Sequence, residues 1–79
     1  MPKLPALTAK ELVRALKRAG FQEDRQKGSH MVLFHPETKR RVVVPMHSGR
    51  SLKRPLLQSI VQKDAGMSVE EFVRLLKGQ

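Results

Sequence analysis

Two short apolar segments, residues 31–34 and 42–44, constrain the fold of this chain most strongly. The first reads Met-Val-Leu-Phe and the second is three valines, and both compositions are typical of buried β-strands. Pro36 and Pro45 follow closely, and neither can donate a backbone N–H to a central sheet ladder. Since turn-forming residues 35–39 separate the segments, the spacing predicts an antiparallel β-hairpin.

A third strand is expected before this hairpin. Residues 23–27 are polar and have little pattern, which indicates a short exposed strand at the edge of a sheet. Gly28 and Ser29 then provide a turn. The three strands together predict an antiparallel meander.

A helix is predicted before the meander, over residues 8–19. Thr8 and Glu11 have the spacing of a capping box, in which each residue satisfies a backbone N–H of the other. Leucine, valine and alanine then recur at helical spacing. Gly20 stands where a left-handed helix end is expected.

Two further helices are predicted after the meander. The second helix begins near Arg54 and Pro55, because proline is well tolerated in a first helical turn, and it ends at Gly66. Ser68 and Glu71 form a second capping box that starts a short third helix. In the second helix, the spacing of the apolar residues predicts a buried face made of Leu56, Leu57, Ile60, Val61 and Ala65.

The predicted order is therefore α-β-β-β-α-α, within a single domain of residues 1–79. A three-stranded antiparallel sheet has two faces, and so few helices can cover only one of them. The expected fold class is α+β, a two-layer sandwich with its helices on one face of the sheet. This is also the layout of the double-stranded-RNA-binding domain.

The charge distribution favours a nucleic-acid partner. The chain has 16 Lys and Arg residues against 7 Asp and Glu residues, a net charge of +9, and a pI near 11.0. No acidic residue occurs between Glu37 and Asp64. Such clustering is typical of nucleic-acid binding, although an acidic protein partner or a merely solvated face would also accommodate it. The candidate RNA-binding residues are Arg40, Arg41, Arg50, Lys53 and Arg54.

The composition also excludes several classes of protein. The chain has no cysteine, so disulfides, zinc–thiolate sites and thiol chemistry are absent. No apolar run approaches the roughly 20 residues of a membrane span, and the first residues lack the apolar core of a signal peptide. The histidines and acidic residues lack metal-ligand spacing. We expect a cytoplasmic protein with no membrane association, no metal and no cofactor.

His30 is the strongest candidate for a chemical role. With Lys27 and Ser29 it places an imidazole, an ammonium and a hydroxyl within four residues, beside a turn. RNA cleavage needs little more, because the 2′-hydroxyl of RNA is itself the nucleophile. One imidazole can serve as its general base or acid, and nearby cations can stabilise the phosphorane.

A structural role for His30 is the alternative, in which the ring merely begins a strand and donates a hydrogen bond. Strand parity places His30 on one face with Val32 and Phe34, but both faces of this strand are largely apolar, so either face could be solvated. The other two histidines are less promising. His35 is expected to be exposed in its turn, and His47 can approach His30 only if its loop folds back over the sheet.

The order of these motifs resembles the HicA (YcfA-like) toxins. The matching features are Gly20 and Phe21 after the first helix, the Gly-Ser-His motif ending at His30, the Val-Val-Pro-Met-His motif ending at His47, and the Leu- and Ile-bearing helix that follows. The resemblance runs from about residue 10 to residue 72. One departure is Pro55, where the family often has glycine.

The resemblance implies a double-stranded-RNA-binding-like fold and an mRNA interferase, the toxin of a type II toxin–antitoxin pair neutralised by a HicB antitoxin. The family's proposed catalytic histidine corresponds to His30, and its second motif histidine corresponds to His47. We therefore expect a metal-independent endoribonuclease with His30 as general acid or base, supported by Lys27, Ser29 and His47. The alternatives are an RNA-binding module without catalysis and a protein-interaction domain.

Overall fold

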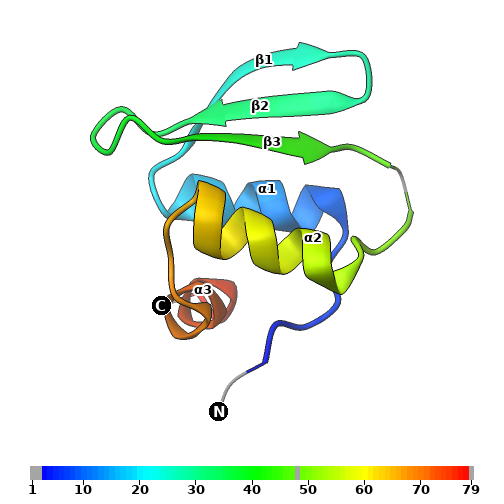
Figure 1. Cartoon of the computed structure of the whole chain (residues 1–79), viewed down its shortest axis with the longest axis vertical. Helices are drawn as coiled ribbons and strands as arrows, with labels where there is room; N and C mark the ends of the chain where they lie inside the picture. The colour runs from blue at the N-terminus through cyan, green and yellow to red at the C-terminus, as the bar shows by residue number, and fades with distance from the viewer. Residues whose placement is uncertain (1–2, 48, 79) are drawn as a thin grey trace.

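The computed structural model describes residues 3–47 and 49–78 and shows an α+β fold with the predicted order of elements (Figure 1). The sheet strands are β1 (Gln22–Lys27), β2 (His30–Phe34) and β3 (Arg41–Pro45). The helices are α1 (Ala9–Arg18), α2 (Arg54–Ser59), the π-helical continuation η1 (Ile60–Asp64) and α3 (Val69–Leu76).

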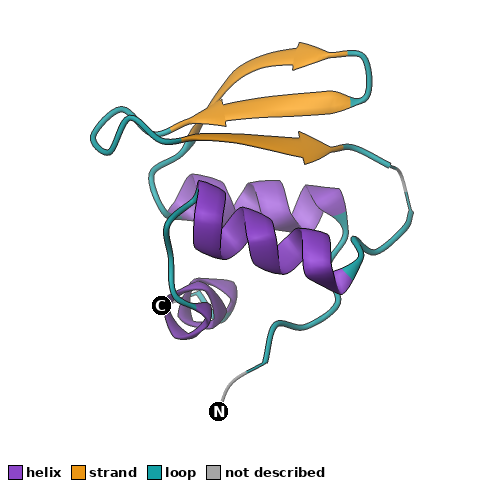
Figure 2. Ribbon diagram, in the orientation of Figure 1, coloured by secondary structure: helices purple, strands orange, loops and turns teal. Residues whose placement is uncertain are grey.

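The three strands form an antiparallel sheet in the order β1-β2-β3, so the predicted meander is confirmed. The α1 and α2 helices lie against one face of this sheet, and α3 packs beneath them (Figure 2). Among the described residues, no helix lies on the opposite face. The prediction that the helices lie on one face of the sheet is therefore confirmed, and the sheet has a covered and an open face.

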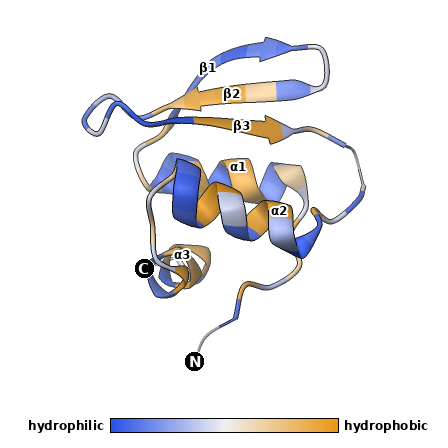
Figure 3. Cartoon of the chain, viewed as in Figure 1, coloured by the Kyte–Doolittle hydropathy of each residue, from blue (hydrophilic) through white to orange (hydrophobic). Residues whose placement is uncertain are grey.

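The core lies between the sheet and the helices. Met31 and Leu33 of β2 and Val42 and Val44 of β3 point into it, while the residues between them do not. Figure 3 shows that β1 is hydrophilic while the central parts of β2 and β3 are hydrophobic. Buried and more exposed residues alternate along β2 and β3 because successive side chains of a strand point to opposite faces, and only one face of the sheet meets the helices. The largest fully buried side chains are Phe72, Leu12, Leu16, Leu33, Leu57, Ile60, Val42, Val44 and Val61.

Both predicted capping boxes are present. The Thr8 hydroxyl accepts from the Glu11 N–H at 3.3 Å, and the Glu11 carboxylate accepts from the Thr8 N–H at 2.9 Å. Ser68 and Glu71 make the same reciprocal pair at the start of α3. These local sequence signals therefore define where two of the helices begin.

The second helix differs from its prediction in two respects. Its last turn is a π-helix, Ile60–Asp64, which the apolar spacing did not indicate. Leu56 was expected to be buried but is 41% exposed, whereas the other four residues of the predicted face are buried. Leu56 lies in the first turn of α2 and lines a surface hollow with Pro45 and Leu52, so its helical phase alone did not place it in the core.

His35 was predicted to be exposed, and this prediction is wrong. The ring is only 9% exposed and packs edge-on against Phe21, with 5.0 Å between the centroids. Its Nδ1 accepts from the backbone N–H groups of Glu37 and Thr38 at 3.2 and 3.3 Å. Nε2 must then carry the proton, and it donates to the Ala19 carbonyl at 3.1 Å.

This histidine joins the end of α1 to the β2–β3 turn. A Cβ at Gly20 would lie 2.6 Å from the His35 Nε2, and Gly20 has a φ of +105°. Glycine is therefore required there both for the backbone conformation and for the close approach of the ring. His35 is a structural residue of this fold.

We predict that His35→Ala lowers the free energy of unfolding by about 2–4 kcal/mol, because it removes a buried ring and leaves the Ala19 carbonyl without its donor. Urea unfolding followed by far-UV circular dichroism measures the change. His47→Ala is the matched control, since His47 is exposed and should change stability by less than about 0.5 kcal/mol. Equal losses in both variants would contradict the structural role of His35.

The capping boxes predict an acid-sensitive contribution to helix stability. Hydrogen bonds from Thr8 hold the pKa of Glu11 below its ordinary value, and Ser68 does the same for Glu71. A carboxyl with a lowered folded-state pKa stabilises the fold above its ordinary pKa, and this contribution is lost as pH falls through the folded-state value. At neutral pH the wild type should therefore have a higher unfolding midpoint than Glu11→Gln. This difference should disappear in acid.

Candidate active site

A two-residue turn places His30 at the first position of β2. Gly28 and Ser29 connect the strands, and Gly28 has a φ of +54°. A positive φ at the first of two loop residues is the requirement of a type II′ hairpin turn, which favours glycine at that position. The resulting hairpin holds His30 directly beside Lys27, its partner in the ladder.

His30 lies on the open face of the sheet. Met31 and Leu33 point to the core, so His30, Val32 and Phe34 point the other way. His30 is exposed to solvent. The structure therefore shows that the strand face with His30, Val32 and Phe34 is the open one, which the sequence did not decide.

Lys27 and Pro45 flank His30 on the same face. The register pairs Lys27 with His30 on one side and Pro45 with His30 on the other. Side chains of directly paired residues share a face, with Cβ atoms about 4.5–5.5 Å apart. The Lys27 ammonium can thus reach the surroundings of the imidazole, as the sequence predicted from their spacing.

Arg25 adds a second cation to this face. The register of β1 shifts between Glu23 and Arg25, which makes room for Asp24 as an extra residue. Beyond the bulge, Arg25 pairs with Val32 and shares its open face. Sequence reasoning missed Arg25, although regular alternation from Lys27 places both residues on the same face.

The loop after β3 begins beside the hairpin turn, because Pro45, the last residue of β3, pairs with His30. The Met46 N–H donates to the Ser29 carbonyl at 2.6 Å. At its other end, the Leu52 N–H donates to the Leu7 carbonyl at 2.7 Å, and Ser51 forms a β-bridge with Thr8. These bonds anchor the loop that carries His47 at the same end of the sheet as His30.

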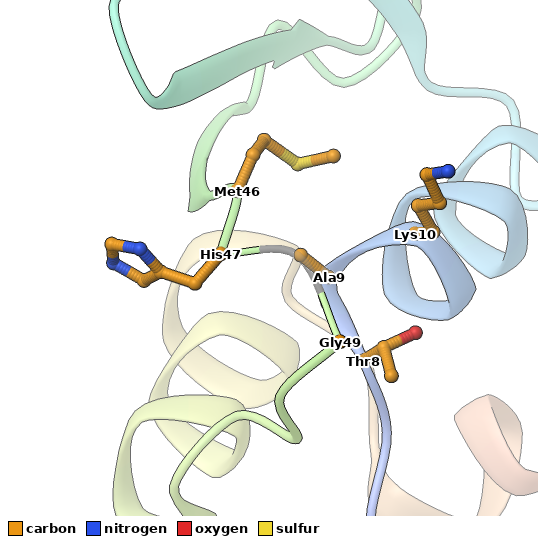
Figure 4. Close-up of a pocket in the computed structure, with 6 residues that line it drawn as sticks. All are labelled: Thr8, Ala9, Lys10, Met46, His47 and Gly49. Carbon is orange, nitrogen blue, oxygen red and sulfur yellow. The ribbon is translucent and has the colours of Figure 1, made fainter.

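His47 is exposed between two surface hollows. Figure 4 shows the first, lined by Thr8, Ala9, Lys10, Met46, His47 and Gly49, with the imidazole pointing away from the Met46 side chain. The second hollow has a volume of about 560 Å³ and brings His47 together with Arg50, Lys53 and the exposed Leu56. Lys10, which lines the first hollow, is not among the RNA-binding residues predicted from the sequence.

The predicted basic residues divide into two groups. Arg50 and Lys53 share the second hollow with His47, at the end of the sheet where His30 lies. Arg54 follows Lys53 but donates to the Leu4 carbonyl at 3.0 Å, which draws its guanidinium toward the N-terminal segment.

Arg40 and Arg41 belong to the opposite end of the sheet. Arg40 donates to the Lys63 carbonyl at 3.3 Å, and Arg41 pairs with Asp24 at 2.8 Å. Arg41 also pairs with Phe34, the last residue of β2, whereas His30 is the first. The structure therefore does not bring these two arginines to His30.

The described residues offer no other obvious chemistry. Within residues 3–47 and 49–78, no three histidine, aspartate or glutamate side chains form a group that could hold a metal ion. In the same ranges, no helix is long and apolar enough to cross a membrane. The site thus consists of one exposed imidazole, an adjacent ammonium, and a loop that carries a second imidazole and further cations.

Comparison with known protein families identifies the chain. The family model described as "HicA toxin of bacterial toxin-antitoxin" matches residues 9–67, which is most of the chain. This protein belongs to the HicA toxin family. A search of curated proteins found no significant match.

Membership in the HicA family gives the site a biological setting. Proteins of this family are the toxin components of bacterial toxin–antitoxin systems. The matched segment contains α1, the whole sheet, α2 and η1, and it ends at Met67, before α3. The turn with His30 and the loop with His47 therefore both lie within the family domain.

We predict that Gly28→Ala lowers the free energy of unfolding by about 1–2 kcal/mol, the cost of a left-handed backbone for a residue with a Cβ. No atom lies within 4 Å of the position such a Cβ would take, so the cost is conformational. Chemical unfolding measures it, and Ser29→Ala is the neighbouring control, expected to be near neutral. An unchanged midpoint for Gly28→Ala would contradict the role assigned to this turn.

Proposed function

We propose that this HicA-family toxin is an mRNA interferase, a metal-independent endoribonuclease that uses His30 as its general acid or base. The observation that carries the proposal is the pairing of an exposed His30 with Lys27 on the open face of the sheet. An imidazole that substrate can reach, beside a cation, meets the basic needs of RNA cleavage. The cytoplasm, where mRNA is translated, is the proposed site of action.

The proposed step is transesterification within the RNA. As a base, the neutral His30 ring accepts the 2′-hydroxyl proton, and the 2′-oxygen forms a bond to the adjacent phosphorus. The bond from phosphorus to the 5′-oxygen breaks, and that oxygen takes up a proton. The products are a 2′,3′-cyclic phosphate and a 5′-hydroxyl, and Lys27 stabilises the charge that develops on the phosphorane.

Two further residues are proposed to support this step. His47 is exposed on the loop anchored to the Ser29 carbonyl, and an imidazole there can supply the proton that the leaving oxygen needs. The Ser29 hydroxyl adjoins His30 in the turn and can hydrogen-bond a phosphate oxygen. Both residues are supporting groups, with His30 as the principal catalyst.

The basic residues near His47 are proposed to hold the phosphate backbone. Arg50 and Lys53 line one hollow and are exposed, so both charges can meet phosphates. Arg54 is exposed beside them, and its bond to the Leu4 carbonyl leaves further donors for RNA. Arg40 and Arg41 are proposed to contact RNA at the other end of the sheet.

A HicB-type antitoxin is the proposed protein partner. The family operates in toxin–antitoxin systems, and an antitoxin inhibits most directly by covering the surface that the substrate needs. The net charge of +9 favours an acidic surface on such a partner. RNA binding without cleavage is the second candidate function, and the layout shared with double-stranded-RNA-binding domains favours it.

We predict that His30→Ala abolishes RNA cleavage and growth arrest while RNA binding persists, because only the proton-transfer group is removed. Cleavage of a labelled mRNA fragment in the presence of EDTA measures the activity and tests its independence of metal. Circular dichroism verifies the fold. If His30→Ala cleaves like the wild type, the assignment of His30 is wrong; if the wild type binds RNA without cleaving it, the second candidate function is correct.

We also predict that Arg50→Ala and Lys53→Ala each weaken RNA binding and reduce the slope of log affinity against log salt by about 0.7–0.9, the value for one lost phosphate contact. Fluorescence anisotropy with labelled RNA at several salt concentrations measures both effects. Arg74→Ala, on α3 away from the sheet, is the control with the same loss of charge. Equal effects in all three variants would indicate general electrostatics without a defined phosphate site.

A further inference from the structure

The open face of the sheet carries an apolar strip that the proposed chemistry does not use. Val32 and Val43 are directly paired on this face, and Val43 is 44% exposed. Phe34 continues the strip along β2 and is half-buried. Starting from His30, the side chains of alternate residues thus present an imidazole, an aliphatic group and an aromatic ring in a line.

Phe34 forms a prepared platform with Arg41. The guanidinium carbon of Arg41 lies 5.1 Å from the centroid of the Phe34 ring. The Asp24 carboxylate accepts a hydrogen bond from Arg41 at 2.8 Å, which orients the guanidinium. Aromatic rings and guanidinium planes are the two surfaces on which proteins stack unpaired RNA bases. The bulge at Asp24 allows this carboxylate to reach Arg41 while Arg25 and Lys27 keep their places on the open face.

Three cations border the strip. Lys27 pairs with His30, Arg25 with Val32, and Arg41 with Phe34, so each of these open-face positions has a basic neighbour in the sheet. This arrangement suits a strand whose bases meet apolar groups while its phosphates meet cations. The carboxylates of an acidic protein would form ion pairs with the cations, but they would not use the stacking surface of Phe34 and Arg41.

The shape of this face favours single-stranded RNA over duplex. The bases of a duplex are stacked within the helix, and such RNA is read through backbone and 2′-hydroxyl contacts across its minor groove. A sheet face with an exposed valine and a half-buried phenylalanine meets unstacked bases instead. Phe34 lies four positions after His30, about 13 Å along a strand, which is long enough for a short stretch of extended RNA.

We propose that the open sheet face is a base-stacking track for single-stranded RNA, with a nucleobase flanking the cleavage site seated on Phe34 and Arg41. The inference rests on the proposed function, since it takes His30 as the point of cleavage. It assigns Phe34 to substrate binding and Arg41 to base stacking in addition to phosphate contact. It also defines the substrate as unpaired RNA.

The chain has no tryptophan and no tyrosine, which permits a direct test. Phe34→Trp in a His30→Ala background introduces the only strong fluorophore at the platform and prevents cleavage. Titration with a single-stranded oligoribonucleotide should quench this fluorescence, because a stacked base contacts the indole. Gln62→Trp in the same background is the control, since Gln62 is exposed in the helical layer and should not be quenched.

The second measurement uses Phe34→Ala in the same His30→Ala background. Affinity for the single strand should fall about 5- to 100-fold, as expected for the loss of one base–aromatic stack, while weaker binding to an RNA duplex should not change. Circular dichroism should match that of the His30→Ala parent. Tight binding of the single strand without quenching, or preference for the duplex, would overturn the proposal.

Two further outcomes separate this proposal from the proposed function. If Phe34→Trp is quenched by RNA but the wild-type protein does not cleave RNA, the stacking track stands and the nuclease assignment fails. If the wild type cleaves RNA but Phe34→Ala, made alone with His30 intact, neither binds nor cleaves differently, the nuclease stands and the track fails. A fluorescence response to the antitoxin alone, without one to RNA, would identify the face as a protein interface and would also overturn the proposal.

Discussion

The structure depends on one constraint: this chain has enough helix to cover only one face of its sheet. The buried residues of β2 and β3 alternate with residues that remain in contact with water, so the strands divide their side chains between a core and an open surface. Met31 and Leu33 must face the helices, because burial of their apolar surface stabilises the fold. His30 is thereby directed to solvent, together with Val32 and Phe34. The position of the candidate catalytic group follows from the packing of its neighbours.

The three histidines illustrate how the same side chain takes different roles. His35 is buried, and both ring nitrogens are occupied by backbone groups, so it serves to hold α1 against the β2–β3 turn. His30 is exposed beside Lys27, where it is available to a substrate. His47 lies on the loop that starts beside the hairpin turn, where the Met46 N–H donates to the Ser29 carbonyl. An imidazole is well suited to chemistry only where solvent and substrate can reach it, and here that condition separates His30 and His47 from His35.

Much of the site was predictable because it is local in sequence. Lys27, Ser29 and His30 surround a two-residue turn, and a tight hairpin pairs its flanking residues whatever the rest of the fold. The distribution of the basic residues was less predictable. Arg40 and Arg41 seemed equivalent to Arg50 and Lys53 by charge, but the length of β3 places the two pairs at opposite ends of the sheet. Their separation places Arg50 and Lys53 beside the His47 imidazole, whereas Arg41 lies over Phe34 and Arg40 bonds the Lys63 carbonyl.

The sequence by itself determined the elements and their order, because capping boxes, prolines and apolar periods act between residues close in the chain. Gly28 and the capping residue Thr8 are examples, since each acts within a single turn. Only the tertiary structure decided which sheet face is open, that His35 is buried, and that a bulge at Asp24 lets its carboxylate hold Arg41 over Phe34. These features depend on contacts between distant segments. The free energy of such contacts comes from burial and from hydrogen bonds that form only when the whole domain has assembled.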